Sequence, residues 1–562
     1  MKAFFKLVLF TLLFSISFVS VSAQNLELLI STKDSSSIST LKPITYSKYH
    51  SSEKKLLKEV TSISKKLALI GFVNNNYVLN HKDSIYNCIY TLNNRIDTLR
   101  IYYNNKSINN KLLDEISSNY TSSYIEIPTN KIELTLNNIV TYFENKGASF
   151  TSASLINIQQ KGTKLTAELK LDISEERKIN TVIIKGYKEF PKKYLQQHLN
   201  LTINSTFNLN TLNKIDKLIH TIPFTTQLKK PQVLFTKDST TLFLYLKKKA
   251  TSLFDGIIGF SNEATSKKLI FNGYLDLTLN NIFNKGETIG FNWKNNGDNT
   301  QTLNLEFKTP YIFKTPFSTS GKFSILKQDS TYVNTKSELN ISYNINSNNF
   351  INAIISNENS NLTSLSNSTI EINNFKNIFL GASYTFKKNS KLQFTNKPKF
   401  LVTASYLIGN RMAANIKSNQ NKIQFTTEYN LEFNNHHSIY IKSTNELLNT
   451  SNLLQNELFR IGGTNSIRGF DEQSIFTSKY SVTNVEYHYN LNEATHIYTI
   501  TDFALINDAI TNSTTTLFAI GLGYYFNTSN SIVNLSYAIG KIDKSPFNLN
   551  NSKVHIKITY PF

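Results

Sequence analysis

The sequence predicts small α+β modules in the N-terminal half, followed by an all-β transmembrane barrel of about sixteen antiparallel strands. Three observations predict this class. The chain begins with an export signal, its hydrophobic period changes from mixed helix and strand to strand alone near residue 250, and its last residues alternate up to a terminal aromatic residue. With 562 residues, several structural units are expected, although a barrel can exceed the usual domain length.

Residues 1–23 are predicted to be a signal peptide. Lys2 and Lys6 flank the start of an apolar run, and the small residues Ser22 and Ala23 stand at its end. This pattern is typical of secretory signals, and the run is shorter than a membrane anchor. No later stretch approaches the roughly 18 to 20 consecutive apolar residues of a spanning helix. We therefore expect an exported protein of the cell envelope, either soluble or a barrel.

Composition and motifs exclude several classes. Only 18% of residues are charged and 40% are apolar, which argues against charge-rich disorder. The single cysteine, Cys88, can close no intramolecular disulfide and cannot build a four-ligand zinc site. His436 and His437 would point to opposite faces of a strand, so no metal site is expected there. Because no catalytic motif, phosphate loop or nucleic-acid module accompanies the net charge of +21, we expect no enzyme, no cofactor and no nucleic-acid partner.

Residues 24–94 are expected to contain an incomplete first module. The stretch 53–71 places apolar residues at steps of three and four before a glycine, which predicts an amphipathic helix. Two alternating stretches follow at 84–91 and 96–103, and the two asparagines between them are a plausible hairpin turn.

Residues 95–177 and 178–249 are predicted to be two complete modules. The clearest helix of the first lies near 132–146, and a strand with one buried face follows at 165–173. The second repeats the order strand, helix, helix, strand, strand, beginning with the apolar strand 179–187.

This element order, together with the phrase Ile184-Lys185-Gly186-Tyr187 after an apolar strand, resembles POTRA domains. These are the periplasmic modules of outer-membrane assembly proteins. The resemblance implies that an exposed strand edge can accept an extended client chain by β-augmentation. An unrelated series of small α+β modules is the alternative.

Residues 250–562 carry the barrel pattern. Clusters of Asn, Ser, Gly, Lys and Asp separate short alternating stretches, for example 268–278, 302–307, 423–433, 438–443, 516–526 and 531–539. Sixteen strands allow about 20 residues for each strand and its turn, against the roughly 9 to 11 that a spanning strand needs. In an exported chain without a spanning helix, this pattern predicts an outer-membrane β-barrel.

The C-terminal stretch predicts the clearest strand. Alternating apolar residues continue to the terminus at Val554, Ile556, Ile558, Tyr560 and Phe562. A terminal aromatic residue after such alternation resembles the β-signal of outer-membrane barrels, with Tyr560 and Phe562 as its residues. The aromatic content of 12% fits the aromatic girdles of these barrels.

The most specific resemblance lies in residues 459–470, which read FRIGGTNSIRGF. Arg468-Gly469-Phe470 is similar to the conserved loop-six motif of the Omp eighty-five superfamily, and the paired glycines upstream match the family's usual phrasing. The stretches 281–287 and 309–313 also resemble phrases of early barrel strands in this family.

The resemblance implies that this loop folds back into the barrel lumen and that Arg468 contacts acids on later strands. The matching acids are Glu486 and Asp502. A guanidinium stays charged and carries five donors, so in a partly dehydrated lumen it needs carboxylate partners. Ile500 and Ala504 stand where the family has an aromatic residue and a glycine, which puts a close backbone approach at that strand in doubt.

By resemblance, the chain inserts barrel proteins into the outer membrane or moves proteins across it, with its N-terminal modules in the periplasm. Its implied partners are unfolded client proteins, outer-membrane lipids and periplasmic chaperones or accessory proteins. One alternative is a two-partner secretion transporter for a dedicated exported protein, in which the helix at 53–71 would be a plug. Another is a passive channel or anchor, against which the loop motif and the modules argue.

Overall fold

The computed structural model describes residues 26–33, 38–105, 108–161, 164–262, 269–295, 300–364, 371–390, 397–507 and 513–562. The predicted signal peptide at 1–23 lies outside the described residues. The chain divides into two compact units: the first ends at Lys178 and also takes Thr206–Asn210, and the second comprises Ile179–Ser205 and Thr211–Phe562. In the part that is described, no helix is long and apolar enough to cross a membrane.

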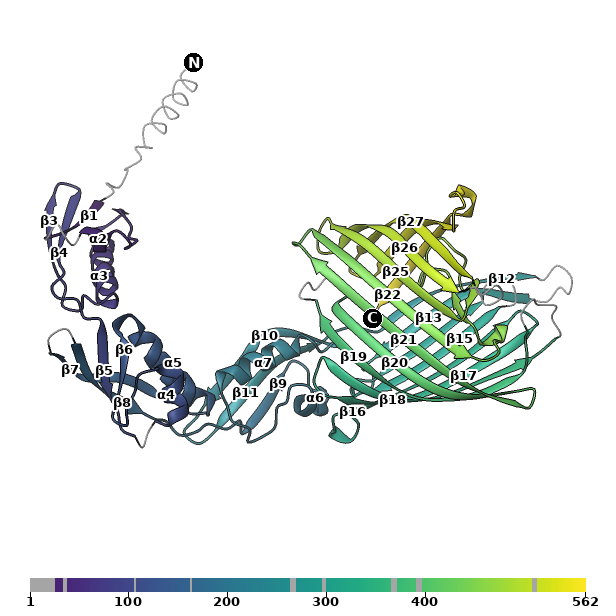
Figure 1. Cartoon of the computed structure of the whole chain (residues 1–562), viewed down its shortest axis with the longest axis horizontal. Helices are drawn as coiled ribbons and strands as arrows, with labels where there is room; N and C mark the ends of the chain where they lie inside the picture. The colour runs from purple at the N-terminus through teal and green to yellow at the C-terminus, as the bar shows by residue number, and fades with distance from the viewer. Residues whose placement is uncertain are drawn as a thin grey trace, which may run out of the picture. The chain divides into compact units, whose positions relative to one another are not determined.

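The first module is a four-stranded sheet covered by a helix (Figure 1). Helix α3 begins after Ser52, whose side chain accepts a hydrogen bond from the backbone N–H of Lys55, as expected of an N-cap. Strand β1 runs parallel to β4, and the sheet order is β2-β1-β4-β3. The elements are β1 (Leu26–Thr32), α2 (Ile38–Leu41), β2 (Tyr49–His50), α3 (Glu53–Leu69), β3 (Asn76–Lys82) and β4 (Ile85–Thr91).

Two expectations for this region differ from the structure. The first module is complete, because β1 and α2 precede α3. The hairpin partner of β4 is β3, joined by a turn at Asp83 with φ 54°, whereas 96–103 belongs to the second module. Strand β3 was missed because nearly all of its side chains are exposed, so its sequence carries no alternation of buried and exposed positions.

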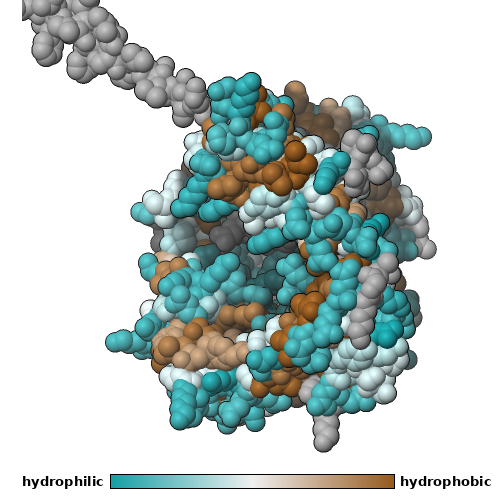
Figure 2. Space-filling view, turned by 90° about the vertical axis from the view of Figure 1, so that its left-hand side faces the viewer, coloured by the Kyte–Doolittle hydropathy of each residue, from teal (hydrophilic) through white to brown (hydrophobic). Residues whose placement is uncertain are grey.

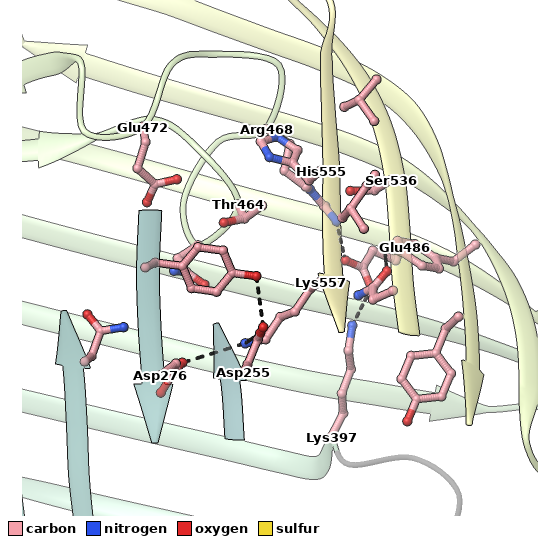
Figure 3. A pocket seen from close by; sticks show the side chains of 18 of the residues that line it. Asp255, Asp276, Lys397, Thr464, Arg468, Glu472, Glu486, Ser536, His555 and Lys557 are labelled. Atoms are coloured by element: carbon pink, nitrogen blue, oxygen red, sulfur yellow. Dashed lines mark hydrogen bonds and ion pairs between the residues drawn. The ribbon is translucent and has the colours of Figure 1, made fainter. Parts of the chain in front are cut away.

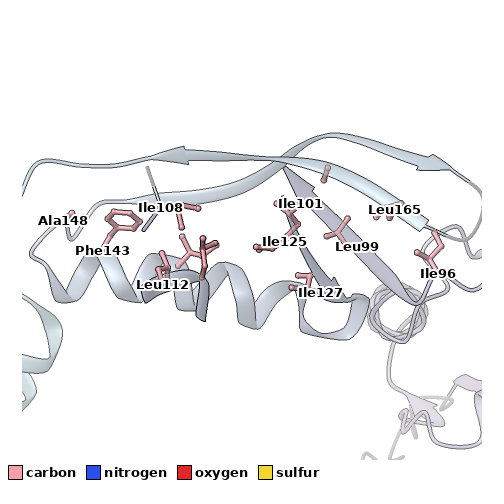
Figure 4. Close-up of a cluster of buried hydrophobic side chains, with 13 residues drawn as sticks. Ile96, Leu99, Ile101, Ile108, Leu112, Ile125, Ile127, Phe143, Ala148 and Leu165 are labelled. Carbon is pink, nitrogen blue, oxygen red and sulfur yellow. The ribbon is translucent and has the colours of Figure 1, made fainter. Parts of the chain in front are cut away.

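The second module has a sheet of order β6-β5-β8-β7, with β5 parallel to β8. Its buried cluster fills the space between this sheet and its helices, and Figure 4 shows the cluster extending from Phe143 and Ala148 at one end to Ile96 at the other. The elements are β5 (Thr98–Tyr102), α4 (Asn110–Ile116), β6 (Tyr124–Pro128), η2 (Thr129–Lys131), α5 (Ile132–Asn145), β7 (Ser152–Lys161) and β8 (Lys164–Asp172).

The third module has a three-stranded sheet of order β10-β11-β9, with β9 parallel to β11. In each module the first strand lies parallel to a strand of the closing hairpin, as the predicted POTRA-like order requires. The predicted class of the N-terminal half is confirmed. The elements are β9 (Thr181–Lys185), α6 (Lys192–Gln197), α7 (Leu209–Ile219), β10 (Thr225–Phe235) and β11 (Thr240–Lys248).

The rest of the described chain is a closed antiparallel barrel of sixteen strands, which confirms the predicted class and strand number. Each strand pairs with its neighbour in sequence, and the loop between β22 and β25 leaves the barrel wall. The strands are β12 (Leu253–Asn262), β13 (Leu269–Asn280), β14 (Thr288–Asn295), β15 (Gln301–Thr309), β16 (Phe317–Gln328), β17 (Tyr332–Asn344), β18 (Asn349–Leu362), β19 (Phe375–Asn389), β20 (Pro398–Ala413), β21 (Ile416–Glu432), β22 (His437–Thr450), β25 (Lys479–Asn490), β26 (Thr495–Asn507), β27 (Thr514–Asn527), β28 (Ile532–Ile542) and β29 (Lys553–Pro561).

The alternation along the barrel strands separates an apolar outside from a polar inside. In β29, Val554 and Ile556 are exposed, whereas the side chain of Lys557 reaches Asp255 and Asp276 inside the barrel at 4.0 Å. A closed barrel with this pattern spans a membrane, and the predicted outer-membrane location is confirmed. Figure 2 views the molecule from the side of its N-terminal modules, and on that face hydrophobic residues form several separate patches among hydrophilic ones.

The strands that close the barrel, β12 and β29, are joined by fewer backbone pairs than any other neighbouring strands of the described barrel. Strands β12 and β29 share two register pairs among the described residues, Leu253 with Pro561 and Phe254 with Tyr560. By comparison, β28 and β29 share seven pairs and β12 and β13 share ten. Pro561 has no N–H to donate, which limits pairing at this end. The contact between the first and last strands is therefore the weakest backbone junction of the barrel wall.

The third module packs on two barrel turns that contain the family-like stretches 281–287 and 309–313. Tyr187 accepts a hydrogen bond from Asn281 Nδ2 at 2.7 Å. Gly286, with φ +70°, lies directly against the ring of Tyr194, since a Cβ there would approach Tyr194 Cε2 to 2.3 Å. The Tyr194 ring also meets the Tyr311 ring edge-on at 5.2 Å between centroids. Both stretches thus form a polar and aromatic joint between module and barrel.

Acidification is expected to weaken this joint through His198. Its Nδ1 lies 2.9 Å from the Tyr311 hydroxyl and its Nε2 lies 2.7 Å from Thr221 Oγ1. Burial lowers the pKa of His198 to about 4, below the ordinary value of about 6.5. Between pH 6.5 and pH 4, His198 therefore binds a proton in the unfolded segment and stays neutral in the folded joint. The stability of the folded joint, fully present above pH 6.5, is lost as the pH falls through this range. At pH 5 the loss amounts to about 2 kcal/mol.

Hydrogen exchange of residues 187–200 in the full chain, followed from pH 7.5 to pH 5 after correction for intrinsic rates, measures this loss. The His198→Gln variant is expected to flatten the pH dependence, whereas the variant at exposed His220, His220→Gln, keeps it. Equal pH dependence in the wild type and in His198→Gln would contradict this role.

Candidate functional site

The candidate site is built by the loop between β22 and β25. Strands β23 (Phe459–Ile461) and β24 (Ile475–Thr477) pair as a short antiparallel ribbon, and the tip of the ribbon carries the predicted motif. Gly462 and Gly463 begin the tip with φ values of 117° and 89°, a region that favours glycine. A Cβ on Gly462 would approach the carbonyl oxygen of Asp471 to 2.2 Å, so the two sides of the tip touch through their backbones.

Arg468 lies in the lumen against the inner wall, and the structure brings it together with both proposed partners, Glu486 and Asp502. Figure 3 shows Arg468 and Glu486. Its Nε and Nη2 donate to the two oxygens of Asp502 at 2.8 and 2.6 Å, and its Nη1 donates to Glu486 Oε1 at 2.6 Å. The backbone N–H of Arg468 also donates to Asp502 Oδ2 at 2.9 Å. All three residues are buried, and Asp502 is 0% exposed.

Glu486 joins this arginine to a wider buried network. Its Oε2 accepts hydrogen bonds from Lys397 Nζ and, at 2.8 Å, from His488 Nε2. The ammonium of Lys397 also lies 3.5 Å from the centre of the Tyr440 ring, within cation–π range. Every charge in this network has an opposite partner, as burial of ionised groups requires.

The other two motif residues pack on β28, which sequence reasoning did not find. Gly469, with φ +81°, lies so close to Gly540 that a Cβ would approach the Gly540 nitrogen to 2.6 Å. A Cβ on Gly540 would in turn approach Phe470 Cε2 to 2.6 Å. The close backbone approach thus occurs at β28, while Ala504 on β26 belongs to the apolar cluster against which Phe470 packs. A glycine inside an alternating strand was the available signal.

A second anchor, also missed, holds the base of the loop on the opposite strands. Arg411 on β20 pairs with Glu457 at 2.5 Å, and both side chains are nearly inaccessible, at 5% and 3%. Gln420 on β21 donates to the second oxygen of Glu457 at 2.7 Å. Arg460 continues the contact by donating to Gln328 on β16 at 2.6 Å. No local pattern links Arg411 with Glu457, since they meet only after the barrel closes.

The loop is therefore a strap attached at two places. We call residues 452–477 the lumen strap: its base contacts β16, β20 and β21, and its tip contacts β25, β26 and β28. A cavity of about 700 Å³, lined mostly by polar and charged residues, lies beside the tip and reaches Asp255 on β12, Asp276 on β13 and Lys557 on β29. The strap occupies the lumen and leaves this cavity next to the barrel closure.

The predicted β-signal residues lie on the closing strand. Tyr560 faces Phe254 across the closure, and the backbone N–H of Phe562 donates to the carbonyl oxygen of Ser252 at 2.9 Å. Both aromatic side chains are exposed on the outer face, at 47% and 57%. The structure thus places them at the junction of the first and last strands and away from the motif in the lumen.

Among the described residues, no three His, Cys, Asp or Glu side chains are arranged to hold a metal ion. His436 Nδ1 contacts the carbonyl oxygen of Asn490 at 3.0 Å, and His437 Nδ1 contacts the Tyr487 hydroxyl at 2.7 Å.

The fold of this chain is similar to that of several solved structures. CdiB from Escherichia coli matches 91% of this chain and 97% of its own length, with a TM-score of 0.53 and 11% identity. CdiB from Acinetobacter baumannii matches 83% and 90%, with a TM-score of 0.51 and 13% identity. BamA from Haemophilus ducreyi lacking POTRA domains 1-3 matches 83% and 99%, with a TM-score of 0.46 and 13% identity. No protein-family model and no curated protein matches the chain.

The matches to the two CdiB structures show that the chain shares their fold across modules and barrel. This fold supports the Omp eighty-five assignment that the loop motif predicts.

Proposed function

We propose that this chain inserts β-barrel proteins into the outer membrane or moves proteins across it. The observation that carries the proposal is the two-pair closure between β12 and β29. An unpaired strand edge is costly in lipid, so a weakly paired β12 can offer its free N–H and C=O groups to an incoming strand. The folding energy of the client would then drive the reaction, without a nucleotide.

Edge strands of the modules support delivery of extended clients. Strand β7 forms one edge of the second sheet and exposes Ile156 and Ile158, while β10 forms one edge of the third and exposes Leu228 and Leu234. Such edges bind extended chains mainly through backbone hydrogen bonds, and apolar side chains add contact area. Unfolded client proteins are therefore the proposed partners of the modules.

A dedicated two-partner secretion transporter is the second candidate, and the fold shared with the two CdiB structures keeps it open. Such transporters are expected to have two POTRA domains and a plug helix. Here α3 buries Leu56, Val60, Ile63 and Leu67 in the core of the first module, so it is a structural helix of that module. A third module and the absence of a free plug in this segment favour the assembly role.

Depletion of the protein in its own host, followed by quantitative outer-membrane and secreted proteomes, separates the two candidates. Loss of many barrel proteins is expected for an assembly factor. Loss of one or two secreted proteins with intact barrels would instead identify a dedicated transporter. If both proteomes are unchanged, neither role holds.

A further inference from the structure

Two carboxylates stand side by side at the lumen face of the barrel closure. Asp255 on β12 lies directly opposite Asp276 on β13 in the antiparallel register. Like charges directly opposite each other destabilise a strand pair. The first two strands, β12 and β13, therefore carry a local excess of negative charge beside the place where the barrel wall is most weakly paired.

Asp255 is only partly satisfied by its surroundings. It is 3% exposed, and its Oδ1 accepts a hydrogen bond from the Tyr274 hydroxyl at 2.9 Å. Its Oδ2 is buried and has no hydrogen-bond partner within the described part of the chain, and the residue lines the cavity beside the lumen strap. A buried carboxylate oxygen without a donor is costly, so this position favours a cationic side chain.

The last strand supplies a cation, although at the limit of ion-pair distance. Lys557 Nζ lies 4.0 Å from Asp255 Oδ2 and 4.0 Å from Asp276 Oδ2. Figure 3 shows the three side chains close together in the lumen. The Lys557 side chain is 59% exposed. Two further charged pairs lie beside the tip: Lys294 with Glu472 at 3.8 Å, and Lys553 with the largely exposed Asp471 at 2.6 Å. Lys557 thus bridges the closure weakly and can be exchanged.

We propose that Asp255 and Asp276 form a recognition site for a lysine or arginine of a client strand, and that Lys557 occupies this site in the resting barrel. The inference rests on the proposed function, in which a client strand pairs with β12. Such a strand turns alternate side chains toward lipid and lumen. The site would then select strands that have an apolar outer face and a basic residue at the lumen-facing position held here by Lys557.

The probes are labelled synthetic peptides with the sequence of residues 551–562, titrated into the full-length protein in lipid nanodiscs. The native peptide is compared with peptides carrying Lys557→Gln or Lys557→Glu, and with a Lys553→Gln peptide as the matched control. Replacement of Lys557 by Gln is expected to weaken binding about five-fold, and by Glu further, as befits a partly exposed ion pair. The Lys553→Gln peptide is expected to bind nearly like the native one, because the carboxylate that pairs with Lys553, Asp471, is 74% exposed and such a pair contributes little.

Two protein variants complete the test. In the Asp255→Asn/Asp276→Asn variant, all peptides should still bind and the preference for Lys557 should disappear. The Lys557→Gln protein should bind the native peptide more tightly than the wild type does, because the site is vacant. Equal binding of the Lys557, Gln and Glu peptides to the wild-type protein would overturn the charge recognition and leave strand pairing intact. Failure of every peptide to bind would contradict strand pairing itself, and the inference with it.

Discussion

Replacement of Arg468 by alanine is expected to give the largest loss of assembly of any single change in the barrel. The substitution removes a bidentate contact to Asp502 and the contact to Glu486, so that Asp502 stays buried without this ion pair and Glu486 keeps only Lys397 and His488. Breaking a buried pair in this way typically costs about 3 to 5 kcal/mol. The strap tip would then leave the wall, and both the folded fraction and the activity of the protein would fall.

The amount of heat-modifiable, folded protein in the outer membrane measures this effect, together with the levels of dependent outer-membrane or secreted proteins. Arg468→Lys should fall between wild type and Arg468→Ala, because lysine keeps the charge and loses the fork geometry. Lys417→Ala on an exposed position of β21 is the matched control and should have little effect. Normal folding, amount and activity of Arg468→Ala would refute the anchoring role.

The second large effect is expected at the base of the lumen strap. Arg411→Ala leaves Glu457 buried at 3% exposure, with Gln420 as a neutral donor. The expected loss of stability is again about 3 to 5 kcal/mol, and it affects the lumen strap. The strap should detach from β20 and β21 while its tip stays held by Arg468, so single-channel conductance in planar bilayers should increase.

The double variant Arg411→Ala/Glu457→Ala separates charge from packing. Removing both partners leaves no unpaired buried charge, so its conductance and stability should lie nearer to the wild type. A wild-type conductance in Arg411→Ala would mean that the base does not close the lumen. Large, stable conductance in the wild type itself, independent of any client, would favour the passive-channel alternative.

Local periodicity predicted the elements whose two faces differ in environment. Helix α3 was expected because Leu56, Val60 and Ile63 recur at helical spacing, and these residues are fully buried in the structure. The strand β29 was expected from its alternation, which divides lipid from lumen. Strand β3 gave no such signal, because both of its faces are largely exposed. Periodicity indicates an element with one buried face. It therefore gives no signal for an edge strand such as β3, neither face of which is buried.

The long-range contacts of the site needed more than periodicity. The family motif pointed to Arg468, Glu486 and Asp502, and the structure places them together. Gly540 and the pair Arg411–Glu457 were missed, since their partners come from distant strands that meet only when the barrel register is set. The two-pair closure at β12 and β29 is likewise a property of register, which no single strand sequence specifies.

The central claim, that the closure between β12 and β29 opens during function, is tested most directly by a reversible cross-link. Phe254→Cys/Tyr560→Cys joins directly opposite residues of the two strands, in a background where Cys88 is replaced by alanine. Phe254→Cys/Leu277→Cys is the matched control, because it joins β12 to β13 and leaves the closure free.

The measurement is the outer-membrane and secreted proteome of the host when each variant is its only copy, before and after mild reduction. We expect the levels of the client proteins to fall when the closure is cross-linked and to recover after reduction. The control pair should leave these levels unchanged. Unchanged proteomes with the closure quantitatively cross-linked would contradict the account.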